Sequence, residues 1–196
     1  MKAYLEIIKK CINKDENFNE ALEIAEGNSS GGKIWIVGSF LYKNILKEKY
    51  GLDNLIVKDY DFILENQTEY SKAWAPENWE IRKTFFGSPR FVKEKLQVDA
   101  YELSKATKDF RKNNSEEKIR SYLKNVLFDI QAMAYDIKNE KIYDEGSINA
   151  IERKEMKVTC LEDSIGIANK KGISLKEYLD YKAKGIGIKA IYPDIR

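Results

Sequence analysis

The apolar and polar positions at the start of the chain repeat at helical spacing. Between residues 2 and 26 the apolar residues fall three or four positions apart, and a polar stretch at 13–16 interrupts them. These apolar positions are Leu5, Ile8, Ile12, Phe18, Leu22 and Ala25. Because one face of an α-helix collects such positions, the pattern predicts two short amphipathic helices.

The pattern then changes to that of a mixed α/β domain. A loop at 27–32 (GNSSGG) precedes an apolar, β-branched run at 33–38 (KIWIVG), and helical spacing returns after Ser39, which predicts a strand, a Gly-Ser turn and a helix. Further strands are predicted at 59–64, 80–85, 96–103, 134–137 and 141–143, and further helices at 116–130, 161–170 and 175–184. This order predicts an α/β (α+β) fold with one mixed sheet flanked by helices.

Composition indicates a globular chain without a bulk charge signal. The 196 residues suit one domain, 43% of them are hydrophobic, and 34 basic residues nearly balance 32 acidic ones. Lys9 and Lys10 interrupt the first apolar run, and no apolar run reaches the roughly 18 residues of a membrane span. We therefore expect a cytoplasmic protein with no membrane partner.

The complete absence of histidine excludes several kinds of catalytic site. It excludes Ser-His-Asp and Cys-His nucleophile systems, histidine general bases and zinc sites with histidine ligands. Cys11 and Cys160 stand far apart, which favours two reduced thiols over a disulfide or a zinc site. The chemistry must therefore use carboxylates, lysines, hydroxyls or a bound metal.

Three aspartates and one turn form the strongest candidate site. Asp59 and Asp61 are two positions apart on one predicted strand, so their side chains share a face about 6.6 Å apart. Asp99, on a later predicted strand, adds a third hard oxygen ligand of the kind that Mg²⁺ prefers. Gly38 and Ser39 end a strand and begin a helix, where backbone N–H groups can approach phosphate. The set suits phosphoryl or nucleotidyl transfer.

The order of these elements resembles the nucleotidyltransferase superfamily related to polymerase beta. Residues 34–40 (IWIVGSF), 58–64 (KDYDFIL) and 128–136 (FDIQAMAYD), with the continuation over 141–157, resemble the head domain of class II CCA-adding enzymes and bacterial poly(A) polymerases. The resemblance covers about residues 33–165 and implies a polymerase-beta-like nucleotidyltransferase core. Helical extensions at 1–26 and 161–196 complete the single expected domain, 1–196.

The resemblance also implies a reaction and a set of site residues. Gly38 and Ser39 match the turn that grips the triphosphate, and Asp59 and Asp61 match the pair that binds Mg²⁺, with Mn²⁺ as the other candidate. Asp99 matches the third carboxylate, which holds the metal that activates the acceptor hydroxyl and is a candidate to accept its proton. The implied activity transfers a nucleoside monophosphate from an NTP to an acceptor hydroxyl and releases pyrophosphate.

Departures from the family pattern keep a second hypothesis open. Tyr42 and Lys43 replace the family's Arg-Asp, residues 125–127 replace its Arg-Arg-Asp, and Gly166 replaces its base-reading arginine. Glu162 and Asp163 keep the acidic part of the base-reading motif and stay candidate nucleotide contacts, as does Lys43. The alternative is a catalytically silent domain that binds RNA, nucleotide or a protein partner. For an active enzyme the acceptor stays open between an RNA 3′ end, a small molecule and a protein.

Overall fold

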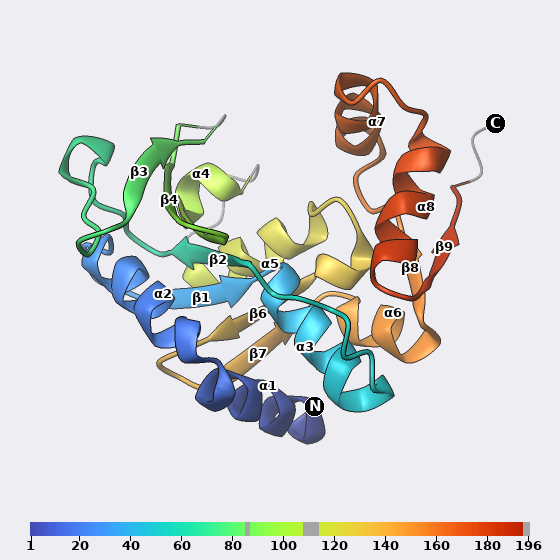
Figure 1. Ribbon diagram of the computed structural model, residues 1–196, viewed down its shortest axis with the longest axis horizontal. Helices are drawn as coiled ribbons and strands as arrows, with labels where there is room; N and C mark the ends of the chain where they lie inside the picture. Colours follow the sequence, from blue (N-terminus) through green and yellow to red (C-terminus); the bar gives the residue numbers. More distant parts are fainter. Residues whose placement is uncertain (85–86, 108–113, 194–196) are drawn as a thin grey trace.

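One seven-stranded mixed sheet organises the computed structural model, which describes residues 1–84, 87–107 and 114–193 (Figure 1). The strand order is β3-β4-β5-β2-β1-β6-β7; β2 and β5 pair in parallel and all other neighbours pair antiparallel. The strands are β1 (Ile34–Val37), β2 (Asp59–Leu64), β3 (Glu80–Lys83), β4 (Pro89–Lys93), β5 (Leu96–Glu102), β6 (Met133–Asp136) and β7 (Lys141–Asp144). The expected fold class is confirmed.

Helices cover both faces of this sheet and extend beyond one end of it (Figure 1). They are α1 (Lys2–Lys14), α2 (Glu16–Gly27), α3 (Ser39–Tyr50), α4 (Leu103–Ala106), α5 (Ser115–Lys124), α6 (Ser147–Arg153), α7 (Leu161–Lys170) and α8 (Leu175–Gly185), with 3₁₀ turns at Tyr70–Lys72 and Asp129–Gln131. A two-stranded parallel sheet of β8 (Glu155–Lys157) and β9 (Lys189–Ile191) lies beside α8. No helix among the described residues is long and apolar enough to cross a membrane.

The larger core lies between the sheet and helices α1 to α3. Tyr60 and Phe62 of β2 point into it, and the Phe40 ring lies 5.0 Å from that of Phe18 and 5.7 Å from that of Tyr60, between centroids. Because side chains alternate along a strand, the residues before and after Tyr60 point to the opposite face. This aromatic cluster therefore fixes the orientation of the two aspartates of β2.

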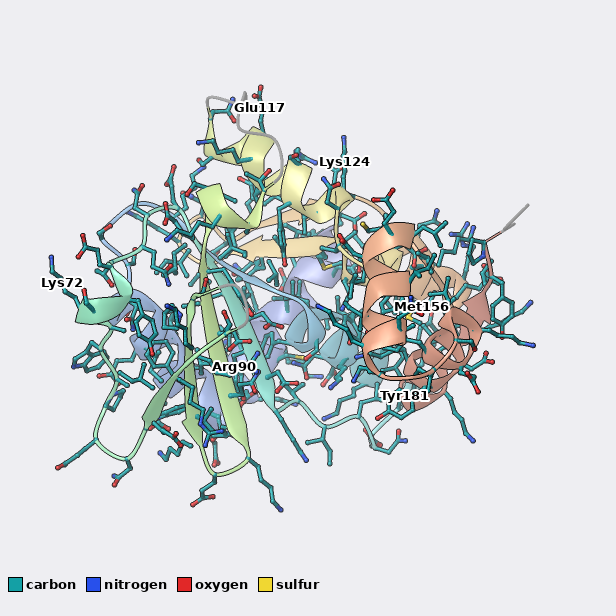
Figure 2. The ribbon with its side chains drawn as sticks, turned by 90° about the horizontal axis from the view of Figure 1, so that it is seen from above. Lys72, Arg90, Glu117, Lys124, Met156 and Tyr181 are labelled. Carbon is teal, nitrogen blue, oxygen red and sulfur yellow. The ribbon has the colours of Figure 1, made fainter. Side chains whose placement is uncertain are left out.

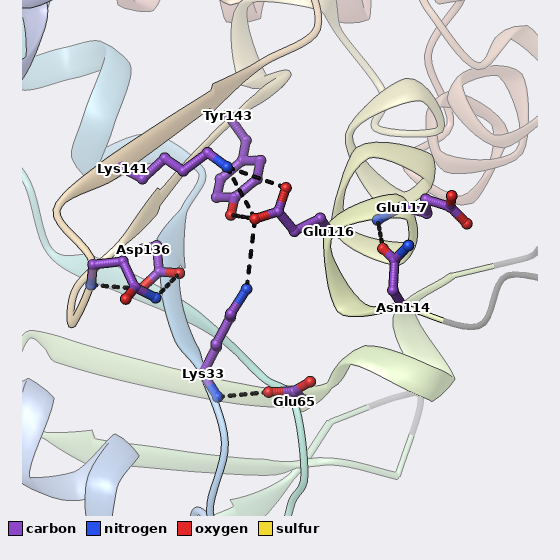
Figure 3. A network of polar contacts seen from close by, with 9 residues as sticks. Lys33, Glu65, Asn114, Glu116, Glu117, Asp136, Lys141 and Tyr143 are labelled. Atoms are coloured by element: carbon purple, nitrogen blue, oxygen red, sulfur yellow. Dashed lines mark hydrogen bonds and ion pairs between the residues drawn. The ribbon is translucent and has the colours of Figure 1, made fainter.

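Helix α5 packs on that opposite face through a smaller core and a polar network. The Glu116 carboxylate accepts hydrogen bonds from Lys141 Nζ at 2.9 Å and Tyr143 OH at 3.0 Å (Figure 3). Lys33 Nζ lies 3.7 Å from the same carboxylate. The contacts join α5 to β1 and β7, while buried Leu123 packs in the smaller core.

The structure corrects one predicted helix and limits one predicted strand. The helix expected at 116–130 ends at Lys124, where the Asn125 side chain donates to the Ser121 carbonyl at 2.8 Å. The backbone of Phe128 is extended because it forms an isolated β-bridge with Val158, and the Phe128 ring packs on Tyr178 of α8. The strand expected at 80–85 ends at position 83 among the described residues, and position 85 lies outside them. Strands β4, β8 and β9 are not predicted by the sequence pattern.

Candidate active site

The turn between β1 and α3 brings backbone into contact with a carboxylate. Gly38 has φ 71° and ψ −141°, a conformation that strongly favours glycine. A Cβ at this position would lie 2.5 Å from Asp61 Oδ2, so the missing side chain also makes room for the aspartate. Ser39 begins α3 and donates a 3.5 Å hydrogen bond to the Asp59 carbonyl. The predicted turn therefore abuts the predicted acidic pair.

All three predicted aspartates lie on one face of adjoining strands. Asp59 and Asp61 belong to β2, and Asp61 stands directly opposite Asp99 in the parallel β2–β5 register. Burial and then the negative charges of Asp99 and Asp59 raise the pKa of Asp61 to about 7, against the opposing effects of Arg90 and Lys43. A cation beside these groups would relieve the unfavourable charge.

Asp99 differs from the other two aspartates because its carboxylate is fully engaged. Arg90 of β4 donates from Nε to Oδ1 and from Nη2 to Oδ2, both at 2.7 Å. The Tyr101 hydroxyl at 3.0 Å and the Gln97 amide at 3.3 Å also donate to Oδ2. The Asp99 side chain is only 3% exposed, and that of Arg90 is 36% exposed. Arg90 thus neutralises the most buried carboxylate of the site.

A cavity of about 710 Å³ opens over these residues. Its other wall comes from the C-terminal part of the chain, and Figure 2 places Arg90 on the strands across from Met156 and Tyr181. The lining comprises Ser39, Tyr42, Lys43, Asp59, Asp61, Arg90, Gln97, Asp99, Tyr101, Leu127, Phe128, Ile130, Gln131, Met156, Ile167, Tyr181, Lys182, Gly185 and Ile186. Its size is within the range of small-molecule sites.

Two lysines give the cavity a cationic part. Lys43 Nζ donates to the Ile56 carbonyl at 3.0 Å, and burial lowers the pKa of this lysine. Burial, followed by the charges of Lys171 and Lys43, also lowers the pKa of Lys182. Both ammonium groups are desolvated, so an anionic ligand such as phosphate would stabilise them.

The two acidic residues expected to contact the base do not line the cavity. Glu162 and Asp163 are exposed in the first turn of α7, and Asp163 Oδ2 lies 2.9 Å from Cys160 Sγ. Ile167, one turn further along the helix, does line the cavity. Their role in nucleotide binding stays a prediction.

Three functional residues of the cavity, Arg90, Tyr101 and Lys182, are among those that the sequence pattern does not identify. Arg90 lies on β4, one of the strands that the sequence pattern does not predict. Tyr101 follows Asp99 by two positions on the same strand, so strict alternation already placed it on the same face. Lys182 belongs to a lysine-rich stretch whose pattern is typical of a solvated surface.

The donor set suits a hard divalent cation, but the carboxylates are not assembled around one. Aspartate oxygens are ligands that Mg²⁺ and Mn²⁺ prefer. Within the described residues, no group of three or more histidine, cysteine, aspartate or glutamate side chains has an arrangement ready to hold a metal. Asp59 and Asp61 would hold the ion, and at Asp99 the ion would compete with Arg90.

Solved structures with the same fold are nucleotide-dependent enzymes. A complex of a CCA-adding enzyme with ATP matches 94% of this chain and 42% of its own, with a TM-score of 0.62 and 15% sequence identity. A complex of a CCA-adding enzyme with CTP matches 79% and 36%, with a TM-score of 0.56 and 16% identity. A tRNA nucleotidyltransferase with primer tRNA and an incoming ATP analogue matches 81% and 43%, with a TM-score of 0.51 and 17% identity.

The comparisons establish the class of fold. The chain has the nucleotidyltransferase fold found in CCA-adding enzymes, as the resemblance implied. It spans about two fifths of the length of these solved chains. No protein-family model and no curated protein sequence matches it.

Proposed function

We propose that the protein is a metal-dependent nucleotidyltransferase that moves a nucleoside monophosphate from an NTP to an acceptor hydroxyl. The observation that carries this proposal is the convergence of Asp59, Asp61 and Asp99 beside the Gly38 turn, in one cavity. Negative carboxylates next to Lys43 and Lys182 suit a magnesium triphosphate, which presents cation and anion together. The shared fold is consistent with NTP use.

Each residue has a distinct part in the proposed reaction. Asp59 and Asp61 hold the cation, Mg²⁺ or Mn²⁺, which supplies neutralisation of the phosphate charge when bound. Ser39 and the first amides of α3 orient the triphosphate. The acceptor oxygen forms a bond to the α-phosphorus, the bond between the α-phosphorus and the bridging oxygen breaks, and pyrophosphate leaves. Asp99 would help to hold the cation that activates the acceptor hydroxyl and is the candidate to accept its proton, as the resemblance implies.

We propose an RNA 3′ end as the acceptor class to test first. One of the enzymes that share the fold is described in complex with a primer tRNA. Tyr181, which is exposed and lines the cavity, presents an aromatic surface on which a base could stack. A small molecule or a protein hydroxyl is the alternative acceptor.

A specific observation also favours the catalytically silent alternative. Both oxygens of Asp99 are held by Arg90, which leaves a two-carboxylate site. Such a domain would bind nucleotide, RNA or a protein partner without transferring a nucleotidyl group. Metal-dependent transfer separates the two functions.

The decisive experiment is transfer of α-³²P-labelled ATP, CTP, GTP and UTP, with Mg²⁺ or Mn²⁺, to total RNA and to the protein itself. Asp59→Asn and Asp61→Asn are the inactive variants, and Asp53→Asn, an exposed loop aspartate, is the matched control. We expect label that disappears in the first two variants and persists in the third. Absence of incorporation with all four nucleotides, together with no metal-dependent NTP binding, would refute the enzyme and favour the silent module.

A further inference from the structure

The ion pair between Arg90 and Asp99 is the most tightly bonded group in the cavity. The two residues are direct cross-strand neighbours of β4 and β5, and the guanidinium meets the carboxylate edge to edge through two 2.7 Å contacts. With the Tyr101 and Gln97 donors, Asp99 receives four hydrogen bonds. Bidentate arginine pairs of this kind are among the stronger charged interactions in proteins.

Asp61 beside it has the opposite environment. Its carboxylate faces Asp99 across the parallel register, and in the described part of the chain it makes no hydrogen bond or ion pair. Lys43, whose charge also lowers the pKa of Asp61, donates its ammonium hydrogen bond to a backbone carbonyl instead. Arg90 is therefore the cation that contacts the acidic cluster directly among the described residues.

A divalent cation placed between Asp61 and Asp99 would need an oxygen that Arg90 now holds. Both Asp99 oxygens carry a guanidinium contact, and the positive charge of Arg90 opposes a second cation there, so arginine and metal compete for this carboxylate. Arg90 also lines the cavity and is partly exposed. It can therefore leave Asp99 without leaving the site.

We propose that Arg90 is a built-in counter-ion that competes with the divalent cation for Asp99 and is released to the phosphates of a bound nucleotide. The proposal rests on the proposed function, because it assigns a positioning role to Arg90 within the same site. A guanidinium fork matches phosphate as well as carboxylate, so the exchange replaces one bidentate partner with another. Full metal occupancy then requires the nucleotide, and metal and nucleotide strengthen each other's binding equally.

The test measures Mn²⁺ binding without nucleotide, from the electron paramagnetic resonance signal of free Mn²⁺. Arg90→Gln frees Asp99 and is expected to tighten Mn²⁺ binding about tenfold, while Arg90→Lys, which keeps one charged donor, gives about threefold. Arg82→Gln is the matched control, because Arg82 lies opposite Arg90 on β3 and pairs with Glu80. Loss of its charge should change the affinity less than about twofold.

A second measurement repeats the titrations with α,β-methylene-ATP present. The tighter Mn²⁺ binding of Arg90→Gln, relative to the unaltered protein, should shrink or reverse. In the unaltered protein the phosphates now draw Arg90 away from Asp99, and the variant lacks the contact between Arg90 and phosphate. A constant advantage in both conditions would contradict the release step. Circular dichroism verifies that each variant is folded. If Arg90→Gln is not folded, the comparison is made between Arg90→Lys and the unaltered protein.

The outcomes separate this inference from the proposed function. Folded arginine variants that bind Mn²⁺ as the unaltered protein does, or more weakly, would overturn the counter-ion while Asp61-dependent binding still supports the enzyme. If neither the unaltered protein nor the Arg90 variants show Mn²⁺ binding that the Asp61→Asn substitution removes, the proposed function itself fails.

Discussion

At the scale of single residues, Gly38 is required for two separate physical reasons. Its positive φ with ψ near −141° is costly for any residue with a Cβ, and the Cβ would also meet the Asp61 carboxylate. Gly51, which ends α3, shares a positive φ of 66° but has no atom within 4 Å of the place where a Cβ would stand. Comparing the two glycines therefore contrasts an ordinary left-handed position with one that is both more strained and in contact with the aspartate.

We predict that Gly38→Ala lowers the free energy of unfolding by about 3 kcal/mol, and Gly51→Ala by about 1 kcal/mol. Only Gly38→Ala should also weaken Mn²⁺ binding, because it displaces Asp61. Urea unfolding and the Mn²⁺ titration measure the two effects. Equal losses of stability, with Mn²⁺ binding intact in both variants, would show that the turn does not position the carboxylate.

Asp61 gives a second prediction, which concerns stability without metal. Burial and the neighbouring carboxylates raise its pKa to about 7, above the value of about 3.9 in an unfolded chain, so the folded state holds the proton more tightly. The cost of ionising Asp61 therefore develops as pH rises from about 4 and is complete above about pH 7. Asp61→Asn removes this cost.

In EDTA, Asp61→Asn should stabilise the protein by about 4 kcal/mol at pH 8, which raises the Tm by about 8–16 °C. The gain should vanish below about pH 4, where the aspartate is protonated in both states. Thermal unfolding over this pH range measures it, with Asp53→Asn as the control for a changed net charge. A gain that is independent of pH would mean that the amide, rather than the removal of charge, stabilises the fold.

At the scale of elements, the sequence predicts those segments whose local pattern and tertiary role agree. The strand at 59–64 was predicted with its observed bounds, because turn residues and a change of hydrophobic period flank it. Its alternation also placed Asp59 and Asp61 on one face, and the helix break at 13–16 coincides with the Asp15 cap of α2. The Gly-Ser turn and the aspartates were therefore accessible from pattern alone.

Elements whose form depends on distant partners were not accessible. The helical pattern continues past Lys124, yet Phe128 lies outside the helix. It forms a β-bridge with Val158 and packs on Tyr178, which follow it in the chain by 30 and 50 positions. Strand β4 has only five residues and starts with Pro89, so its pattern is weak until β5 pairs with it. Arg90 was missed for that reason, since nothing local relates it to Asp99. The single-domain boundaries stay a prediction.

At the scale of the whole molecule, the cavity joins two parts of the fold that are far apart in the sequence. The sheet supplies carboxylates and Arg90, and α8 supplies Tyr181 and Lys182 (Figure 2). A ligand that fills the cavity therefore touches both parts at once. Helix α1, which packs on α3 within the larger core, lies outside the cavity lining.

We predict that ATP with Mg²⁺ slows amide hydrogen exchange in β2, β5 and α8 together, at least about threefold, and leaves α1 unchanged. Exchange followed by mass spectrometry resolves these segments. Lys182→Ala should lose the protection in α8 and keep part of that in the sheet. Protection confined to the sheet in the unaltered protein would mean that the nucleotide does not reach the C-terminal helices.

The position of Arg90 in the sheet separates the tuning of the site from its construction. The carboxylates stand on β2 and β5, whereas Arg90 stands on β4, the inner strand of the β3–β4 hairpin; among the described residues no strand pairs with the outer side of β3. An edge hairpin tolerates exchange better than an inner strand, because fewer neighbours constrain it. Grafting a different hairpin would thus reset the charge balance of the cavity, while the placement of Asp59 and Asp61 on β2 is kept.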